Sequence, residues 1–89
     1  MSWKIELKPT AVKQYKKFDN KTRKRIKKAL YNLQSLPHPL LNNKVKPLVG
    51  ELKGDYRLRV GNLRILFTIR EKIRRIYVYA IVPRGKAYK

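Results

Sequence analysis

Arginine side chains alternate with apolar residues in the segment GDYRLRVGNLRILF, Gly54 to Phe67. Gly61-Asn62 is a pair that closes a two-residue hairpin, and such a turn fixes which residues face each other. Arg59 then lies opposite Arg64, with Arg57 on the same face. A guanidinium group stays charged in proteins and offers phosphate oxygens a planar fork of donors. These arginines are therefore suited to clamping an anion rather than to taking up a proton.

The other face of this ribbon is apolar, and we expect it to pack against helices. The same register pairs Val60 with Leu63, Leu58 with Ile65 and Tyr56 with Phe67. Like charges directly opposite each other on a sheet cost up to roughly 1 kcal/mol, and we expect no acidic residue near the arginines on their face. That outer face is either simply solvated or built to receive an anionic ligand.

Apolar periodicity predicts the elements that come before the hairpin. Residues 2–8 alternate apolar and polar side chains, which is typical of a half-buried strand. Thr10 is a plausible N-cap for a short helix. Asp19 or Asn20 can begin a second helix that runs to about Leu36, with one apolar stripe beneath a lysine-rich face. The two helices together resemble a helical hairpin.

Proline and a change of period divide the rest of the chain. Residues 37–47 hold three prolines, which predicts a loop with no helix through it. Three strand-like runs follow: YRLRV, LRILFTI and RIYVYAIV. The order strand, two helices, three strands predicts an α+β domain, in which a helical hairpin packs on one face of an antiparallel sheet. With 89 residues, the chain is expected to form a single domain, 1–89.

The last predicted strand adds aromatic side chains to the outer face. Continuing the alternation places Tyr77, Tyr79 and Ile81 there. Aromatic rings beside arginines can stack on bases or on guanidinium groups, so this face is a reasonable platform for RNA. Alternatively, Tyr77 and Tyr79 pack under the 37–47 loop.

The charge balance is the most unusual property of the composition. Lys and Arg number 24 against 5 Asp and Glu, for a formal net charge of +19. The commonest partner of a small, strongly basic domain is nucleic acid, although acidic proteins and anionic membrane surfaces also attract such a charge. The chain has no cysteine and one histidine, so we expect no metal site and no cofactor. Without an apolar run near ~20 residues, it is expected to be soluble and cytoplasmic.

The stretches LVGELKGDYRLRVGNLRILFTI and IYVYAIVPRGKAYK resemble the RelE/ParE superfamily of bacterial and archaeal toxins. The resemblance covers nearly the whole chain and implies the same order of elements. RelE-type members are metal-independent endoribonucleases that cleave mRNA in the ribosomal A site and thereby inhibit translation. An acidic or partly disordered RelB-like antitoxin wraps around such a toxin and keeps it silent.

Carried over by motif, the resemblance implies five catalytic residues: Arg57, Arg59, Arg64, Arg84 and Tyr88. The best-known members carry lysines where this chain has Arg57 and Arg59, which leaves the general base open. Tyr88 has the right chemical type, since a phenol in a cationic pocket ionises more easily, and Lys86 and Lys53 are weaker candidates. We also expect four RNA-binding residues: Tyr77 and Tyr79 from the alternation of the last strand, together with the basic residues Lys53 and Lys86.

Three functions remain open at the level of sequence. The resemblance implies a ribosome-dependent RNase whose partners are the ribosome, mRNA and an acidic antitoxin. ParE-type members of the same superfamily instead poison DNA gyrase without cutting RNA. The third alternative is a non-catalytic basic module that binds RNA. The lysine-rich helices are either a solvated surface or one that grips ribosomal RNA.

Overall fold

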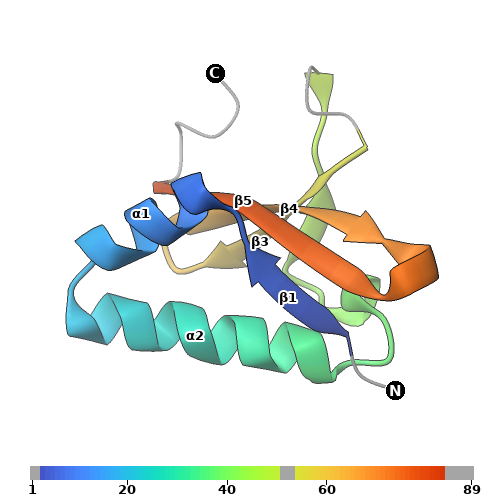
Figure 1. The fold of residues 1–89 in the computed structure, drawn as a ribbon, viewed down its shortest axis with the longest axis horizontal. Helices are drawn as coiled ribbons and strands as arrows, with labels where there is room; N and C mark the ends of the chain where they lie inside the picture. The colour runs from blue at the N-terminus through green and yellow to red at the C-terminus, as the bar shows by residue number, and fades with distance from the viewer. Residues whose placement is uncertain (1–2, 51–53, 84–89) are drawn as a thin grey trace.

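The two helices lie on one side of a five-stranded sheet (Figure 1). The computed structural model of the protein describes residues 3–50 and 54–83. In chain order its elements are β1 (Lys4–Leu7), α1 (Pro9–Lys17), α2 (Asn20–Ser35), the 3-10 turn η1 (Pro39–Leu41), β2 (Val45–Pro47), β3 (Tyr56–Val60), β4 (Leu63–Arg70), the 3-10 turn η3 (Glu71–Ile73) and β5 (Arg75–Pro83). The predicted α+β class, with a helical hairpin against one face of a sheet, is confirmed.

The sheet is mixed rather than purely antiparallel. Its strand order is β1-β5-β4-β3-β2, and β1 runs parallel to its neighbour β5, while the other three pairs are antiparallel. Parallel neighbours need a long crossover connection, and here the helical hairpin and three strands separate β1 from β5 in the chain. The predicted antiparallel sheet is therefore wrong at this one pair.

The sheet also gains a strand where a loop was predicted. Residues 37–47 contain the short turn η1 and the strand β2, which pairs with β3 from Val45 opposite Leu58 to Pro47 opposite Tyr56. Proline lacks the N–H that a central strand would need, but an edge strand tolerates it. Pro47 ends such an edge strand, so its presence was misleading evidence against β structure.

Both helices begin close to where the sequence indicates. The first starts at Pro9, one residue before the predicted cap, because proline suits the first helical position. Asp19 caps α2 by accepting a 2.8 Å hydrogen bond from the Thr22 amide. Hydrogen bonding from the side chain and the backbone of Thr22 holds the pKa of Asp19 below its ordinary value.

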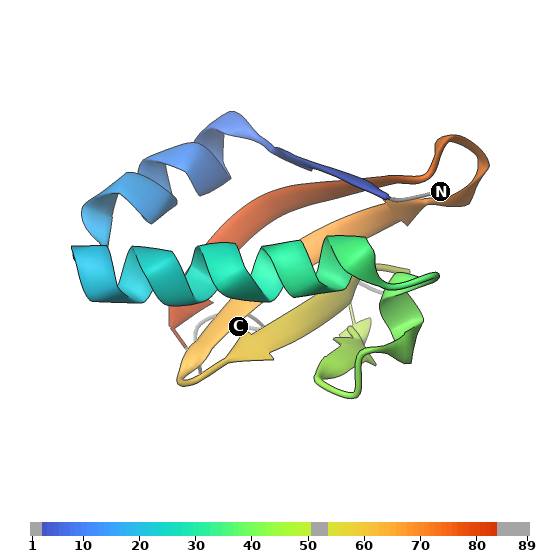
Figure 2. The same cartoon turned by 90° about the horizontal axis from the view of Figure 1, so that it is seen from below.

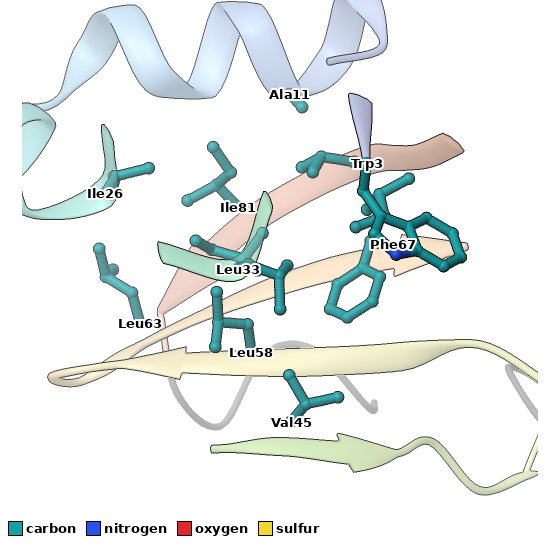
Figure 3. Close-up of a cluster of buried hydrophobic side chains, with 12 residues drawn as sticks. Trp3, Ala11, Ile26, Leu33, Val45, Leu58, Leu63, Phe67 and Ile81 are labelled. Carbon is teal, nitrogen blue, oxygen red and sulfur yellow. The ribbon is translucent and has the colours of Figure 1, made fainter. Parts of the chain in front are cut away.

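Figure 2 shows α2 lying across one face of the sheet, and the hydrophobic core fills the space between the helices and the sheet (Figure 3). Its buried members come from both layers: Trp3, Ala11, Ile26, Leu33, Val45, Leu58, Leu63, Ile65, Phe67, Ile76, Val78 and Ile81. The Trp3 indole donates a 2.9 Å hydrogen bond to the carbonyl oxygen of Pro37, which ties the start of the chain to the segment that follows α2. The apolar face of the β3-β4 ribbon lies in this core, as predicted.

A bulge in β5 reverses the alternation of its side chains. Leu66 pairs with Ala80 and Phe67 with Val78, so Tyr79 is the extra residue on the β5 side. After the extra residue of a bulge, each side chain points to the face opposite to the one that strict alternation predicts. Ile81 was predicted on the outer face, and this is wrong: it is 1% exposed and points into the core beneath the helices (Figure 3).

Candidate functional site

The hairpin between β3 and β4 has the predicted register at every position. The pairs are Tyr56 with Phe67, Arg57 with Leu66, Leu58 with Ile65, Arg59 with Arg64 and Val60 with Leu63. Gly61 has a φ of +59°, in the left-handed region that favours glycine. This turn geometry fixes the two arginines opposite each other.

The three predicted arginines lie on the outer face, which neither helix covers, but their environments differ. Arg59 is exposed, Arg57 is half-buried and Arg64 is only 6% exposed. One guanidinium nitrogen of Arg57 donates a 2.9 Å hydrogen bond to the Lys44 carbonyl oxygen. A guanidinium nitrogen of Arg64 donates one of 3.2 Å to the carbonyl oxygen of Leu63. The face thus combines one desolvated guanidinium with cations that reach solvent.

The unpredicted strand β2 adds Lys46 to this set. Lys46 is exposed and pairs directly with Arg57. Its neighbour Val45 lies in the core, so the alternation along β2 turns Lys46 to the outer face. Sequence reasoning missed this lysine because the flanking prolines suggested a loop, although Val45-Lys46 already had strand alternation. We call Lys46, Arg57, Arg59 and Arg64 the arginine cluster.

The outer face also holds an acidic residue that sequence reasoning missed. Asp55 accepts a 2.8 Å hydrogen bond from the Thr68 hydroxyl and one of 3.0 Å from the Tyr79 hydroxyl. The expectation of no acid on this face is therefore wrong. The sequence spacing could have predicted this position. Asp55 lies two residues before Arg57, and a strand returns to the same face every second residue.

The predicted aromatic residues lie on the outer face of β5. Tyr77 pairs with Thr68 across to β4, and the Lys8 ammonium lies 4.7 Å from the centroid of its ring. Tyr79 is held by Asp55 through its hydroxyl. The sheet order places β4 and β3 between β5 and β2, so the alternative position under the 37–47 segment is not supported.

A second pair of opposed arginines occurs farther along β4 and β5. Arg70 faces Arg75 across these strands. Arg75 has an ionic contact of 3.5 Å with Glu6 of the neighbouring strand β1. Arg70 is exposed, and its guanidinium has no hydrogen bond or ion pair with any residue in 3–50 or 54–83. Sequence reasoning missed this pair because no two-residue turn fixes the register between β4 and β5, which the longer η3 segment connects.

Four of the predicted site residues lie outside the described residues: Lys53, Arg84, Lys86 and Tyr88. Among the residues that are described, His, Asp and Glu side chains nowhere gather in groups of three that could hold a metal ion. None of the described helices is both long and apolar enough to cross a membrane.

The sequence matches one protein-family model over nearly its whole length. A protein-family model described as the ParE toxin of type II toxin-antitoxin system, parDE, matches residues 5–88. A comparison with curated protein sequences finds no significant match.

Solved structures with the same fold include toxins with and without their antitoxins. A chain of the toxin-antitoxin complex RelBE2 from Mycobacterium tuberculosis has a TM-score of 0.80 at 20% identity, covering 94% of this chain and 100% of that one. A chain of the archaeal RelE-RelB complex from Pyrococcus horikoshii has a TM-score of 0.78 at 24% identity, with coverages of 98% and 100%. The isolated E. coli RelE toxin has a TM-score of 0.73 at 16% identity, covering 96% of this chain and 87% of that one. At these identities the likeness establishes the fold.

Proposed function

This chain belongs to the RelE/ParE superfamily of toxins from type II toxin-antitoxin systems, and we propose that it is a ribosome-dependent endoribonuclease that cleaves mRNA in the A site. The observation that carries the proposal is the arginine cluster. Arg59 and Arg64 face each other on the side of the sheet that the helices leave uncovered. Such a pair is unfavourable by itself, and a phosphate bound between the two strands would relieve the repulsion.

The proposed reaction needs no metal ion or cofactor. The ribose 2′-hydroxyl attacks the adjacent phosphorus, the bond from phosphorus to the 5′-oxygen breaks, and a 2′,3′-cyclic phosphate forms. A base takes the 2′ proton, and an acid protonates the departing 5′-oxygen. Negative charge builds on the phosphoryl oxygens in the transition state, where preorganised guanidinium groups stabilise it.

Within the arginine cluster, Arg64 is the best candidate for this electrostatic role. Its side chain is 6% exposed, and a charge removed from water acts through a lower effective dielectric constant than a charge in solvent. Arg57 and Arg59 would hold the phosphate from β3. The RelE pattern suggests Tyr88 as the base, with Lys86 and Lys53 as weaker candidates, and Arg84 as the group that assists the leaving oxygen.

We further propose that an acidic antitoxin is the cellular partner. The net charge of +19 favours a partner of the opposite sign. Two of the structurally similar chains were crystallised as RelB-RelE-type complexes, which supports a comparable pairing. Ribosomes, mRNA and such an antitoxin would meet this protein in the cytoplasm.

Gyrase inhibition is the second candidate function. The family model that matches the chain describes a ParE toxin, and ParE-type members poison DNA gyrase. The two functions make different demands on the arginine cluster. Only the RNase needs it to stabilise a pentacoordinate phosphorus in the transition state.

Parallel assays on the purified protein distinguish these functions. Programmed ribosomes carrying a defined mRNA are incubated with the protein, and primer extension maps the cuts, while supercoiling by gyrase is followed separately. We expect cuts in the A-site codon and normal supercoiling. Inhibited supercoiling with intact mRNA would replace the RNase by the gyrase poison, and activity in neither assay would contradict both.

A matched pair of variants links the activity to the arginine cluster. Arg59→Ala removes an exposed cation from the cluster, and Arg75→Ala removes the same charge elsewhere on the outer face. Losing one preorganised donor typically lowers the rate by about 10²–10³-fold, so Arg59→Ala should be nearly inactive and Arg75→Ala active. Equal activity of the two variants would remove the cluster from the proposed site.

A further inference from the structure

A groove of about 330 Å³ lies on the outer face, on the part of the sheet that contains the Arg70-Arg75 pair. Its lining comes from β4, β5, the turn η3 and the residue just before α1: Lys8, Thr68, Arg70, Ile73, Tyr77 and Tyr79. None of these six belongs to the arginine cluster. The groove lies within the size range of about 300–1,000 Å³ that is usual for small-ligand sites.

The groove offers two cations to a ligand. Arg70 is exposed and its guanidinium has no ion pair or hydrogen bond with the described parts of the chain, 3–50 and 54–83. The Lys8 ammonium reaches the groove over the ring of Tyr77, at 4.7 Å. Each nearby acid already has a partner: Glu6 contacts Arg75, Glu71 contacts His38, and Asp55 accepts hydrogen bonds from two hydroxyls of the groove lining. The two cations, Lys8 and Arg70, therefore favour an anionic ligand in this groove.

Two polar residues of the groove lining are held in place. Thr68 and Tyr79 each donate a hydrogen bond to the same carboxylate, that of Asp55. These bonds are partly buried, and they join β4, β5 and the residue preceding β3. Lining residues fixed in this way lose little conformational freedom on binding a ligand.

Tyr77 gives the groove an aromatic surface. Its ring is half-buried and now has the Lys8 ammonium over it. Stacking of a nucleic-acid base on an aromatic ring is generally stronger than an exposed cation–π contact. A base can thus take the place of the ammonium, and the flexible lysine stem lets Lys8 move to a neighbouring phosphate.

We propose that this groove is a subsite for one nucleotide of single-stranded RNA, with the base stacked on Tyr77 and the flanking phosphates bound by Lys8 and Arg70. The inference rests on the proposed RNase function and adds a second contact point for the substrate. Arg70 is six residues along β4 from Arg64, about 20 Å at ~3.3 Å per residue. The groove therefore binds a nucleotide at a distance from the scissile phosphate.

An acidic peptide, such as an antitoxin segment, is the competing ligand. It would use the same two cations, but it has no planar base to cover the Tyr77 ring. Single-stranded nucleic acid uses both a basic groove and an aromatic platform. The combination of the two in one groove favours RNA.

The Arg70-Arg75 pair provides a matched experiment on the full-length protein. Arg70→Ala and Arg75→Ala each remove one positive charge from the same face, but only Arg70 lines the groove. Binding of a fluorescent short oligouridylate is measured by anisotropy over a range of salt concentrations. We expect Arg70→Ala to weaken binding and to reduce the slope of log K against log salt by about 0.7, and Arg75→Ala to leave both nearly unchanged.

Tyrosine variants test the stacking contact separately. Tyr77→Leu should weaken binding of oligouridylate by about tenfold, and Tyr77→Phe, which keeps the ring, should bind like the wild type. An oligonucleotide with abasic sites should bind equally to Tyr77→Leu and to the wild type. Circular dichroism confirms that each variant is folded.

The results separate this inference from the proposed function. If Arg70→Ala and Tyr77→Leu bind oligouridylate like Arg75→Ala while the wild type still cleaves ribosome-bound mRNA, the subsite is contradicted and the RNase survives. If Arg70→Ala loses binding to polyglutamate and retains binding to oligouridylate, the groove is a peptide site and the nucleotide subsite is contradicted. If oligouridylate binds as expected but no mRNA is cut, the groove survives and the RNase is overturned.

Discussion

Two pairs of opposed arginines lie on the outer face of the sheet. The two pairs differ in how their charges are exposed to solvent and to acidic side chains. Arg70 and Arg75 are both solvent-accessible, and Glu6 on the next strand lies 3.5 Å from Arg75. In the other pair, Arg59 is exposed while Arg64 is 6% exposed. Solvent and Glu6 reduce the repulsion between Arg70 and Arg75, whereas the Arg59-Arg64 pair contains a cation that is largely removed from water.

This difference predicts different roles for the two pairs. Salt and water screen interactions between exposed charges, but they screen a buried charge much less. The field of Arg64 is thus suited to stabilising charge that develops in a transition state. Of the other pair, the exposed Arg70 is suited to salt-dependent contact with a polyanion, whereas Arg75 contacts Glu6.

The largest expected effect is on catalysis when Arg64 is replaced. Arg64→Ala should lower single-turnover cleavage on programmed ribosomes by about 100-fold or more, because a preorganised donor to the phosphoryl oxygens is lost. Arg75→Ala should stay within about twofold of the wild type, because Arg75 is half-buried, contacts Glu6 and lies outside the arginine cluster. Arg64→Lys keeps the charge without the planar fork and should fall between them. Equal losses for Arg64→Ala and Arg75→Ala would remove the distinction between the pairs.

A smaller effect is expected on stability when Asp55 is replaced. Asp55→Ala removes the carboxylate that accepts the partly buried hydrogen bonds from Thr68 and Tyr79. The free energy of unfolding in urea should fall by about 1–3 kcal/mol. The same substitution should weaken oligouridylate binding in the groove more than it slows cleavage, because both hydroxyls belong to residues that line the groove.

Glu71→Ala is the matched control for removing one acid. Its carboxylate contacts His38 at 2.9 Å on the exposed surface, so the expected loss is below about 1 kcal/mol. If Asp55→Ala were no more destabilising than Glu71→Ala, the Asp55 hydrogen bonds would not be holding the outer face together.

The smallest effect is expected when Glu6 is neutralised. Glu6→Gln removes the acid beside Arg75 and should expose the repulsion between Arg75 and Arg70, at a cost below about 1 kcal/mol. The melting temperature should fall at low salt and recover at high salt, since exposed charges are screened. In an Arg75→Gln background the same change should have no effect. A loss that persists in that background would mean that Glu6 acts through other contacts.

Some features of the fold and the candidate site could be predicted from the sequence, and others could not. The alternation of YRLRV and LRILF was sufficient to predict the hairpin register and the apolar face of β3 and β4. Lys46 was missed because three prolines in residues 37–47 outweighed a short strand signal. Ile81 was misplaced because a bulge depends on how β5 meets β4, which neither strand indicates alone. Asp55 was readable from its spacing to Arg57, although it was overlooked.

By itself, the sequence determined which arginines oppose each other at the Gly61-Asn62 turn, because a two-residue turn and a period of two leave only one pairing. The tertiary structure decided which of those arginines is buried. It also decided that β2 brings Lys46 beside Arg57, that β1 brings Glu6 to Arg75, and that Lys8 and Arg70 share a groove. These features arise from contacts between segments far apart in the chain, which local periodicity does not encode.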